Sequence, residues 1–227
     1  MLVCSAVFLI QVCACVCVCA YPCVRACVCV CADICTENPT VQAEIVDQHN
    51  AFRRAVEPTA ADMLIMATKL YLQIIPSYAM GENLFFASAP HMWTDVINAW
   101  HSEVENYQYP NGSTNGKAIG HYTQVIWCSS NITLWSALKQ IKWGQKTHDF
   151  HLFNRGNFRT VAPYKAGPPC ASCPNSCENK LCNNPCPYIN RFRNCPALKK
   201  QHGCSNTLVY AWCPAECKCN NEIIAVG

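Results

Sequence analysis

The stretch CASCPNSCENKLCNNPC, residues 170–186, contains five cysteines within seventeen residues. The five later cysteines bring this C-terminal group to ten, at Cys170, Cys173, Cys177, Cys182, Cys186, Cys195, Cys204, Cys213, Cys217 and Cys219. A structural zinc site usually takes its four ligands as two close pairs such as C-x2-C. Cys170 and Cys173 form one such pair, but Cys217 and Cys219 are too close together for the usual second pair. An even count in a segment of about 50 residues favours disulfides, because so short a segment buries too little apolar surface to hold its fold.

Disulfides persist in oxidising compartments, so this composition predicts a secreted, extracellular protein. The chain has 227 residues and 21 cysteines, a net charge of +3 and only 14% charged residues. Because the positive excess is small and no run of Lys and Arg occurs, we expect no nucleic-acid partner.

The N-terminal stretch MLVCSAVFLIQVCACVCVCA, residues 1–20, is apolar apart from Ser5 and Gln11. It is typical of the hydrophobic region of a signal peptide, although the basic start is missing. A membrane anchor is the alternative interpretation, but Pro22 and Arg25 interrupt the apolar run. Residues 13–32 consist almost entirely of Cys, Val, Ala and Arg, which also fits a translated nucleotide repeat. We therefore expect no specific fold there. The resulting division is a signal or low-complexity segment at 1–35, a domain at 36–162, a Pro/Gly hinge at 163–185 and a stapled module at 186–219.

The central domain mixes helical and strand patterns, which predicts an α+β fold. Apolar residues at helical spacing predict a helix over 38–57 that Pro58 ends. MWTDVINAWHSEVENYQY, residues 92–109, has one continuous apolar stripe and is the clearest predicted helix. GENLFF, residues 81–86, is a turn that enters a short buried segment. GHYTQVIWCSS, residues 120–130, alternates like a strand, and residues 129–160 are predicted as strand or coil.

These segments resemble the cysteine-rich secretory proteins (CRISPs). PCASCPNSCENKLCNNPC and the later cysteines are similar to the cysteine-rich domain of that family. IVDQHNAFRRAVEPTAADML, GENLFFASAP, WHSEVENYQY and GHYTQVIW resemble its CAP (SCP/antigen-5/PR-1) domain. The resemblance implies an α-β-α sandwich CAP domain followed by a small disulfide-rich, mostly short-helical module similar to sea-anemone potassium-channel toxins (ShKT).

The resemblance also implies a disulfide pairing. In the hinge it gives Cys170–Cys177 and Cys173–Cys182. In the terminal module it gives Cys186–Cys219, Cys195–Cys213 and Cys204–Cys217.

Two regions depart from the family pattern. Residues 67–80 lack the Trp, Cys and His of a longer helical segment, and residues 128–155 lack further cysteines and strands. We therefore expect an incomplete CAP domain in which Cys128 has no partner.

The CAP cleft of the family holds two histidines and two glutamates and can bind zinc. Glu82, Glu103 and His121 match three of these four positions. No cofactor is required on this interpretation, and zinc is an alternative for these three residues. We favour structural roles, with the glutamates as hydrogen-bond partners and His121 as a strand residue.

No enzyme activity is predicted. The sequence has no G-x-S-x-G motif, and Ser102, next to Glu103, comes with no recognisable base. NGS at Asn111 and NIT at Asn131 are acceptor motifs for glycosylation.

The terminal module carries the predicted function, which is regulation of an ion channel or binding to a cell-surface protein. Its channel-facing candidates combine positive charge with an aromatic ring, namely Lys199, Lys200, Tyr210 and Lys218. We expect a monomer, with peripheral contact to a membrane. The alternatives are a CAP-cleft binder of zinc or a sterol, and a degenerate family member without activity.

Overall fold

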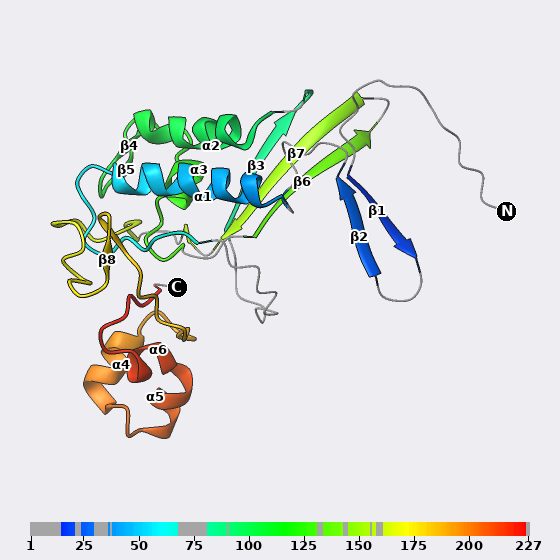
Figure 1. The fold of residues 1–227 in the computed structure, drawn as a ribbon. Coiled ribbons are helices and arrows are strands. Elements are labelled where there is room, and N and C mark those ends of the chain that lie inside the picture. Colours follow the sequence, from blue (N-terminus) through cyan, green and yellow to red (C-terminus); the bar gives the residue numbers. More distant parts are fainter. Residues whose placement is uncertain are drawn as a thin grey trace.

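The structure is a computed structural model, and it describes residues 15–20, 24–29, 36, 38–67, 81–89, 91–130, 134–142, 145–154, 156–157 and 161–225. Most of the predicted signal segment, residues 68–80 and Asn131 lie outside these residues. Three groups of elements follow one another along the chain (Figure 1): an α/β domain, a hinge and a helical C-terminal module.

Helix α1, Pro39–Arg54, begins where the sequence predicts. The Asn38 side chain accepts a hydrogen bond of 3.0 Å from the Thr40 amide, and Pro39 occupies the first turn, where its missing N–H costs nothing. Val41 and Ile45 are buried against the neighbouring helices. The helix ends three residues before the predicted boundary, at Arg54.

Helix α2, Trp93–His101, is shorter than the predicted helix over 92–109, because the chain continues as the 3-10 helix η1, Ser102–Asn106. The predicted stripe is buried from Trp93 to Trp100. Glu44 of α1 accepts hydrogen bonds from the amide and the hydroxyl of Thr94, at 2.8 and 2.7 Å. This carboxylate satisfies free donors at the start of α2 and joins the two helices side by side (Figure 1).

The prediction of a strand at 120–130 is wrong, since Gly120–Val125 forms helix α3. The Glu103 carboxylate accepts from the amides of His121 and Tyr122, at 2.8 and 3.2 Å, and so caps the first turn. Asn157 contributes at the same end, because its side-chain amide donates to the Gly120 carbonyl at 2.6 Å. Contacts from distant residues thus override the strand propensity of Tyr122, Thr123 and Val125.

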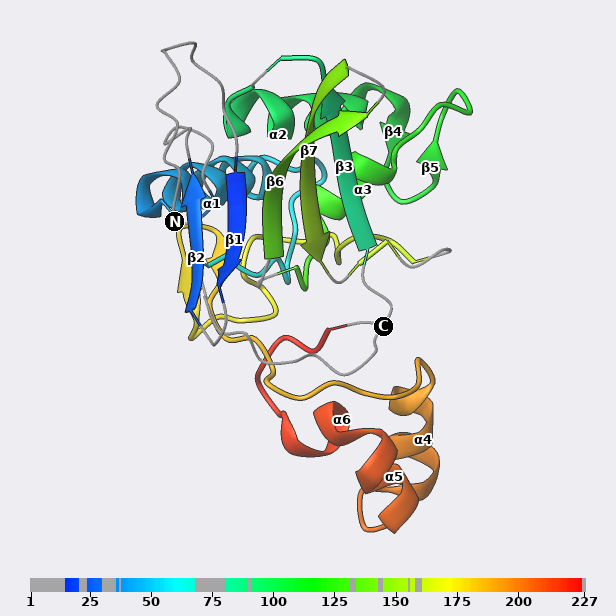
Figure 2. The same cartoon turned by 90° about the vertical axis from the view of Figure 1, so that its right-hand side faces the viewer.

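A three-stranded antiparallel sheet supports these helices, in the order β3-β7-β6. Its strands are β3, Gly81–Ala87, β6, Leu134–Lys142, and β7, Gln145–Asn154. β3 pairs with β7 from Gly81↔Asn154 to Ala87↔His148. Helices α1 and α2 lie behind the sheet in Figure 2, and Phe150 of β7 is buried in the core that they share.

The loop after α1 is held from within by Arg53, which is 1% exposed. Its guanidinium donates to the carbonyls of Leu64, Val125, Trp127 and Cys128, over distances of 2.7 to 3.0 Å. A buried guanidinium is stable only when its donors are satisfied, and here the backbone satisfies them. Arg53 therefore ties α1, Leu64 and the end of α3 into one unit.

Gly156 lies where no side chain fits. A Cβ atom at this position would be 2.7 Å from Cγ of Trp127 and 2.8 Å from Nε2 of Gln124. The close approach lets Asn157, next in the chain, reach α3.

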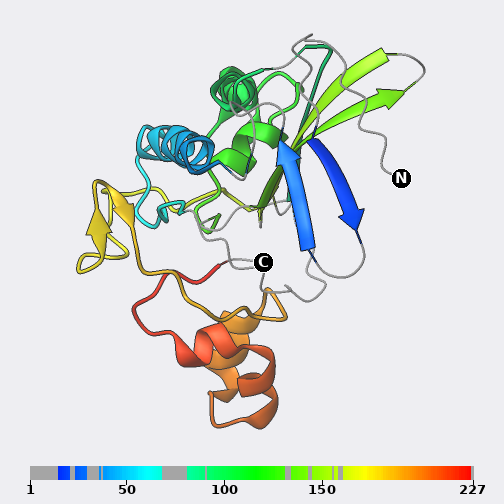
Figure 3. The ribbon, with the colours of Figure 1, turned by 45° about the vertical axis from the view of Figure 1, so that its right-hand side comes forward.

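The hinge is built into the α/β domain through backbone hydrogen bonds. The amide of Ile65 donates to the Cys182 carbonyl at 2.8 Å, and the amide of Cys182 donates to the Met63 carbonyl at 2.7 Å. The hinge also forms its own two-stranded hairpin from β8, Cys177–Glu178, and β9, Leu181–Cys182. Figure 3 shows the hinge, in yellow, close to α1, with the C-terminal helices beyond it.

The C-terminal module contains α4, Cys195–His202, α5, Thr207–Trp212, and α6, Pro214–Lys218. Five disulfides connect Cys170–Cys177, Cys173–Cys182, Cys186–Cys219, Cys195–Cys213 and Cys204–Cys217. These are the five pairs that the family resemblance implies. Among the described residues, Cys128 is a free, buried cysteine.

Two small hairpins complete the structure. Strands β1, Cys15–Ala20, and β2, Val24–Cys29, pair in an antiparallel register within the segment where no fold is predicted. β4, Tyr107–Gln108, and β5, Gly112–Ser113, form a short hairpin after η1. In the part of the chain that the structure describes, every helix is too short or too polar to cross a bilayer.

Candidate functional site

The structure brings together two of the three predicted cleft residues. The Glu103 carboxylate lies 2.7 Å from Nδ1 of His121. Its second oxygen accepts from the backbone at the start of α3, so the same side chain orients the histidine and caps its helix. The His121 side chain is 39% exposed while Glu103 is 14% exposed, which leaves the imidazole at the rim of the α/β domain.

Glu82 does not join this pair in a group that could hold a metal. Successive residues of a strand point to opposite faces, and the neighbouring Asn83 points toward α3, where its amide donates to the His121 carbonyl at 3.0 Å. Glu82 is exposed on β3. Among the described residues, the one group of potential ligands with mutually close atoms is Cys170, Cys173 and Cys182, and all three are in disulfides. The three expected ligands are therefore not gathered into one group of close ligand atoms among the described residues.

His49 is a buried titratable residue that the sequence analysis does not single out. Desolvation lowers its pKa to about 4, and Nδ1 lies 2.7 Å from the Ile45 carbonyl within α1. Its Nε2 has no hydrogen-bond partner among the described residues. The imidazole is therefore neutral at physiological pH and belongs to the packed interior. A histidine on the apolar side of the predicted helix was the only signal that pointed to it.

Ser102 is not arranged as a nucleophile. Its hydroxyl donates to the Ala99 carbonyl at 2.7 Å, which is the ordinary contact of a serine at the end of a helix. Cys128 is also unsuited to this role, because burial raises the pKa of its thiol far above the ordinary value.

A cationic and aromatic surface lies on the C-terminal module. The Lys218 ammonium is 4.5 Å from the ring centroid of Tyr188 and 5.2 Å from that of Tyr210. Tyr188 is 40% exposed and Tyr210 is 48% exposed, so both rings and the lysine are open to a partner. We call these three residues the lysine–tyrosine surface. Sequence analysis identified Lys218 and Tyr210 and missed Tyr188, which lies thirty residues before the lysine and is brought to it by the Cys186–Cys219 disulfide nearby.

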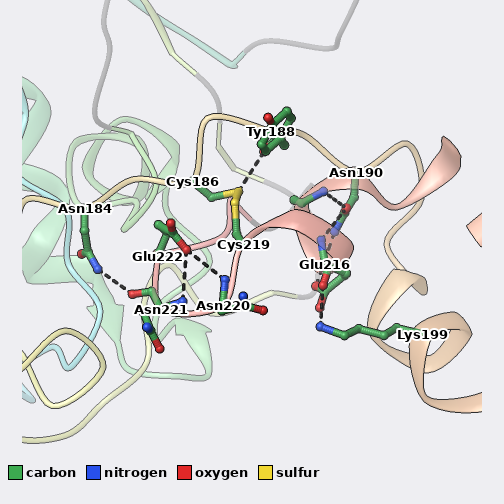
Figure 4. Close-up of a disulfide and its surroundings, with 11 residues drawn as sticks. Asn184, Cys186, Tyr188, Asn190, Lys199, Glu216, Cys219, Asn220, Asn221 and Glu222 are labelled. Carbon is green, nitrogen blue, oxygen red and sulfur yellow. Dashed lines mark hydrogen bonds between the residues drawn. A yellow bond between two sulfur atoms is a disulfide. The ribbon is translucent and has the colours of Figure 1, made fainter. Parts of the chain in front are cut away.

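The other two channel-facing candidates, Lys199 and Lys200, lie on α4 and outside the lysine–tyrosine surface. Lys199 turns toward α6, where its ammonium donates to the Glu216 carbonyl (Figure 4). Asn190 holds the start of the same helix, since its side-chain oxygen accepts from the amides of Ala215 and Glu216, at 3.0 and 3.3 Å. Lys199 thus fixes the packing of α4 on α6, whereas Lys200 is exposed.

One of the two glycosylation motifs can be located. Asn111 is exposed beside the turn of the β4–β5 hairpin, where an oligosaccharide has room. Asn131 lies outside the described residues.

Comparisons with known proteins found a matching family model and solved structures of similar fold. The family model described as Crisp matches residues 170–224. The solved structure of a hookworm platelet inhibitor has a TM-score of 0.50 at 18% identity, covering 64% of this chain and 91% of that one. Na-ASP-1 is 20% identical, with a TM-score of 0.48 over 63% of this chain and 47% of its own, so the chain spans about half of that relative. NaASP2, solved with Zn2+, has a TM-score of 0.49 at 20% identity, over 66% of this chain and all of that one.

Proposed function

Residues 170–224 form a Crisp-family domain, and from this premise we propose that the chain is a secreted, non-enzymatic protein that regulates a cell-surface ion channel. The contact is made by the lysine–tyrosine surface of Tyr188, Tyr210 and Lys218. The observation that supports this proposal is the exposed ammonium held between two exposed rings.

The charge of the chain supports a partner with negative potential at its entrance. Residues 186–227 contain five Lys and Arg against two Glu, which equals the net charge of +3 of the whole chain. The vestibule of a cation channel attracts positive side chains, because it concentrates cations for permeation. A lysine flanked by aromatic rings can offer both a charge and apolar contact to such a site.

The rigidity of the module supports binding without a large ordering cost. Three disulfides connect residues 186–219, and α4, α5 and α6 pack around the buried Cys195–Cys213 pair. Side chains on a cross-linked scaffold lose little conformational freedom when they dock. The same disulfides support secretion, because they persist in oxidising compartments.

The test is electrophysiology on a panel of potassium and calcium channels with the purified full-length chain. We expect reduced current from at least one channel, and we expect Lys218→Ala to raise the half-effective concentration by roughly tenfold, as for a binding hot spot. Lys117→Ala is the matched control, since Lys117 is an exposed lysine of the α/β domain. The proposal fails if no channel responds, or if the two variants weaken the effect equally.

A further inference from the structure

Two disulfides of the hinge lie beside each other and differ in accessibility. In Cys170–Cys177 the Cys177 residue is exposed, whereas Cys170 is 5% exposed. In Cys173–Cys182 both residues are buried, at 2% and 1%. A thiol in solution can therefore reach the first disulfide at Cys177 and cannot reach the second.

The buried end of the accessible disulfide lies next to the inaccessible one. The sulfurs of Cys170, Cys173 and Cys182 are all within 4.8 Å of one another. Any thiolate released at Cys170 would therefore lie beside both sulfurs of the neighbouring bond. Such proximity makes an intramolecular attack far faster than attack by a dilute external thiol.

The local backbone favours one of the two exchange products. The Cys173 amide donates to the Cys170 carbonyl at 2.9 Å, which closes a turn over the C-x-x-C sequence CASC. Such a turn brings its first and fourth Cα atoms within about 7 Å, which is compatible with a disulfide between them. C-x-x-C is also the spacing of the dithiols that exchange readily in oxidoreductases.

Cys182 is positioned to act as the leaving group and then remain in place. Its amide and carbonyl are hydrogen-bonded to Met63 and Ile65, so the backbone of β9 stays attached to the α/β domain without help from the disulfide. Its loss as a thiolate therefore need not unfold the hinge.

We propose that the hinge is a thiol–disulfide exchange site that attaches a small external thiol at Cys177. The thiolate attacks Sγ of Cys177, which forms a mixed disulfide and releases the Cys170 thiolate. Cys170 then attacks Sγ of Cys173, which forms Cys170–Cys173 and releases the Cys182 thiolate, and this takes up the proton that the external thiol gave up. One thiol is consumed and one thiol is produced, and the number of disulfides stays at two, so no oxidant is needed.

The test uses the full-length chain and reduced glutathione as the external thiol. After incubation, acid stops the exchange, the chain is denatured and labelled with N-ethylmaleimide at low pH, and peptides are mapped by mass spectrometry. We expect glutathione on Cys177, a Cys170–Cys173 disulfide and a maleimide label on Cys182. Cys128 is the internal standard, because it is a free thiol before and after the reaction.

Two double variants isolate the relay. In Cys170→Ser/Cys177→Ser the accessible disulfide is absent, so the Cys182 label should fall to the level of an untreated sample. In Cys204→Ser/Cys217→Ser a disulfide of the C-terminal module is removed instead, and the Cys182 label should remain as in the wild type. The peptide map of the wild-type chain tests the proposed exchange even if a variant fails to fold. The proposal is overturned if glutathione does not attach at Cys177, or if it attaches there and Cys170 is labelled while Cys173–Cys182 stays intact.

Discussion

Replacing Arg53 by methionine tests how much one buried side chain contributes to the stability of the α/β domain. The substitution keeps most of the aliphatic length and removes the guanidinium, which donates five hydrogen bonds to four carbonyls. Two of these carbonyls keep a second donor, because Trp127 also accepts from the Ser130 amide and Cys128 accepts from the Leu64 amide. The carbonyls of Leu64 and Val125 lose the donors that Arg53 supplies.

A buried carbonyl without a donor costs about 1–3 kcal/mol, so the two carbonyls together give a loss of about 2–6 kcal/mol. The wild type also carries a cost that the variant escapes, since burial lowers the pKa of Arg53 to about 10 by disfavouring its charge. We therefore expect the free energy of unfolding to fall by about 2–4 kcal/mol, in the lower part of that range.

The assay is urea unfolding followed by tryptophan fluorescence, because Trp93, Trp100 and Trp127 are buried reporters of this domain. Arg54→Met is the matched control. Arg54 is the next residue of the same helix and is partly exposed, and its side chain makes one hydrogen bond to the described residues, of 3.2 Å to the Asn179 carbonyl. Its replacement should cost less than about 1 kcal/mol. Equal losses for the two variants, or no loss for Arg53→Met, would refute the idea that the carbonyls depend on this guanidinium.

Three further predictions concern packing, pH and modification. Gly156→Ala should lower the free energy of unfolding by about 1–3 kcal/mol, measured by urea unfolding, because the added Cβ would be 2.7 Å from Trp127. The pKa of His49 is lowered to about 4 in the folded chain, so its contribution to stability is fully present above pH 6.5 and is lost as pH falls toward 4. In His49→Phe the urea midpoint should therefore depend less on pH over that range. The smaller pH dependence that remains should come from His101, whose pKa burial also lowers. A pH dependence equal to that of the wild type would contradict the assignment to His49. Secretion from a glycosylating host should add an enzyme-removable glycan at Asn111, and Asn111→Gln should abolish that mass; a peptide map with Asn111 unmodified would count against the prediction.

The sequence predicted where α1 and α2 begin, because those signals are local, although α2 ends earlier than predicted. Asn38 and Pro39 define the start of α1, and the apolar stripe from Trp93 to Trp100 defines α2. The α3 helix could not be predicted this way. Its first turn depends on the Glu103 carboxylate and on Asn157, which lie many residues away in both directions.

The candidate sites were likewise predicted where the signal is local in the sequence and missed where it depends on the fold. The cysteine spacing and the family resemblance pointed to the Crisp domain, which the family model confirms. Tyr188 was missed because its relation to Lys218 depends on the fold of the cross-linked module. The position of Glu82 relative to His121 depends on which face of β3 Glu82 takes, opposite to Asn83, and motif order along the chain does not contain that information.

The hinge and the α/β domain share a single structural segment, and this has a consequence for how the lysine–tyrosine surface is presented. Residues 61–65 receive Arg53 on one side and pair with the hinge on the other, through Ala61, whose carbonyl accepts from the Ser172 amide at 3.0 Å, and through Ile65. Because the same short segment serves both contacts, a change at Arg53 is transmitted to the backbone that carries Cys182. The C-terminal module follows directly after Cys182, so its attachment to the α/β domain depends on α1 as well as on its own disulfides. Because the lysine–tyrosine surface lies on a module that its own three disulfides hold together, Arg53→Met should lower the free energy of unfolding and leave channel binding as in the wild type, whereas weakened binding would show that the α/β domain contributes to the contact.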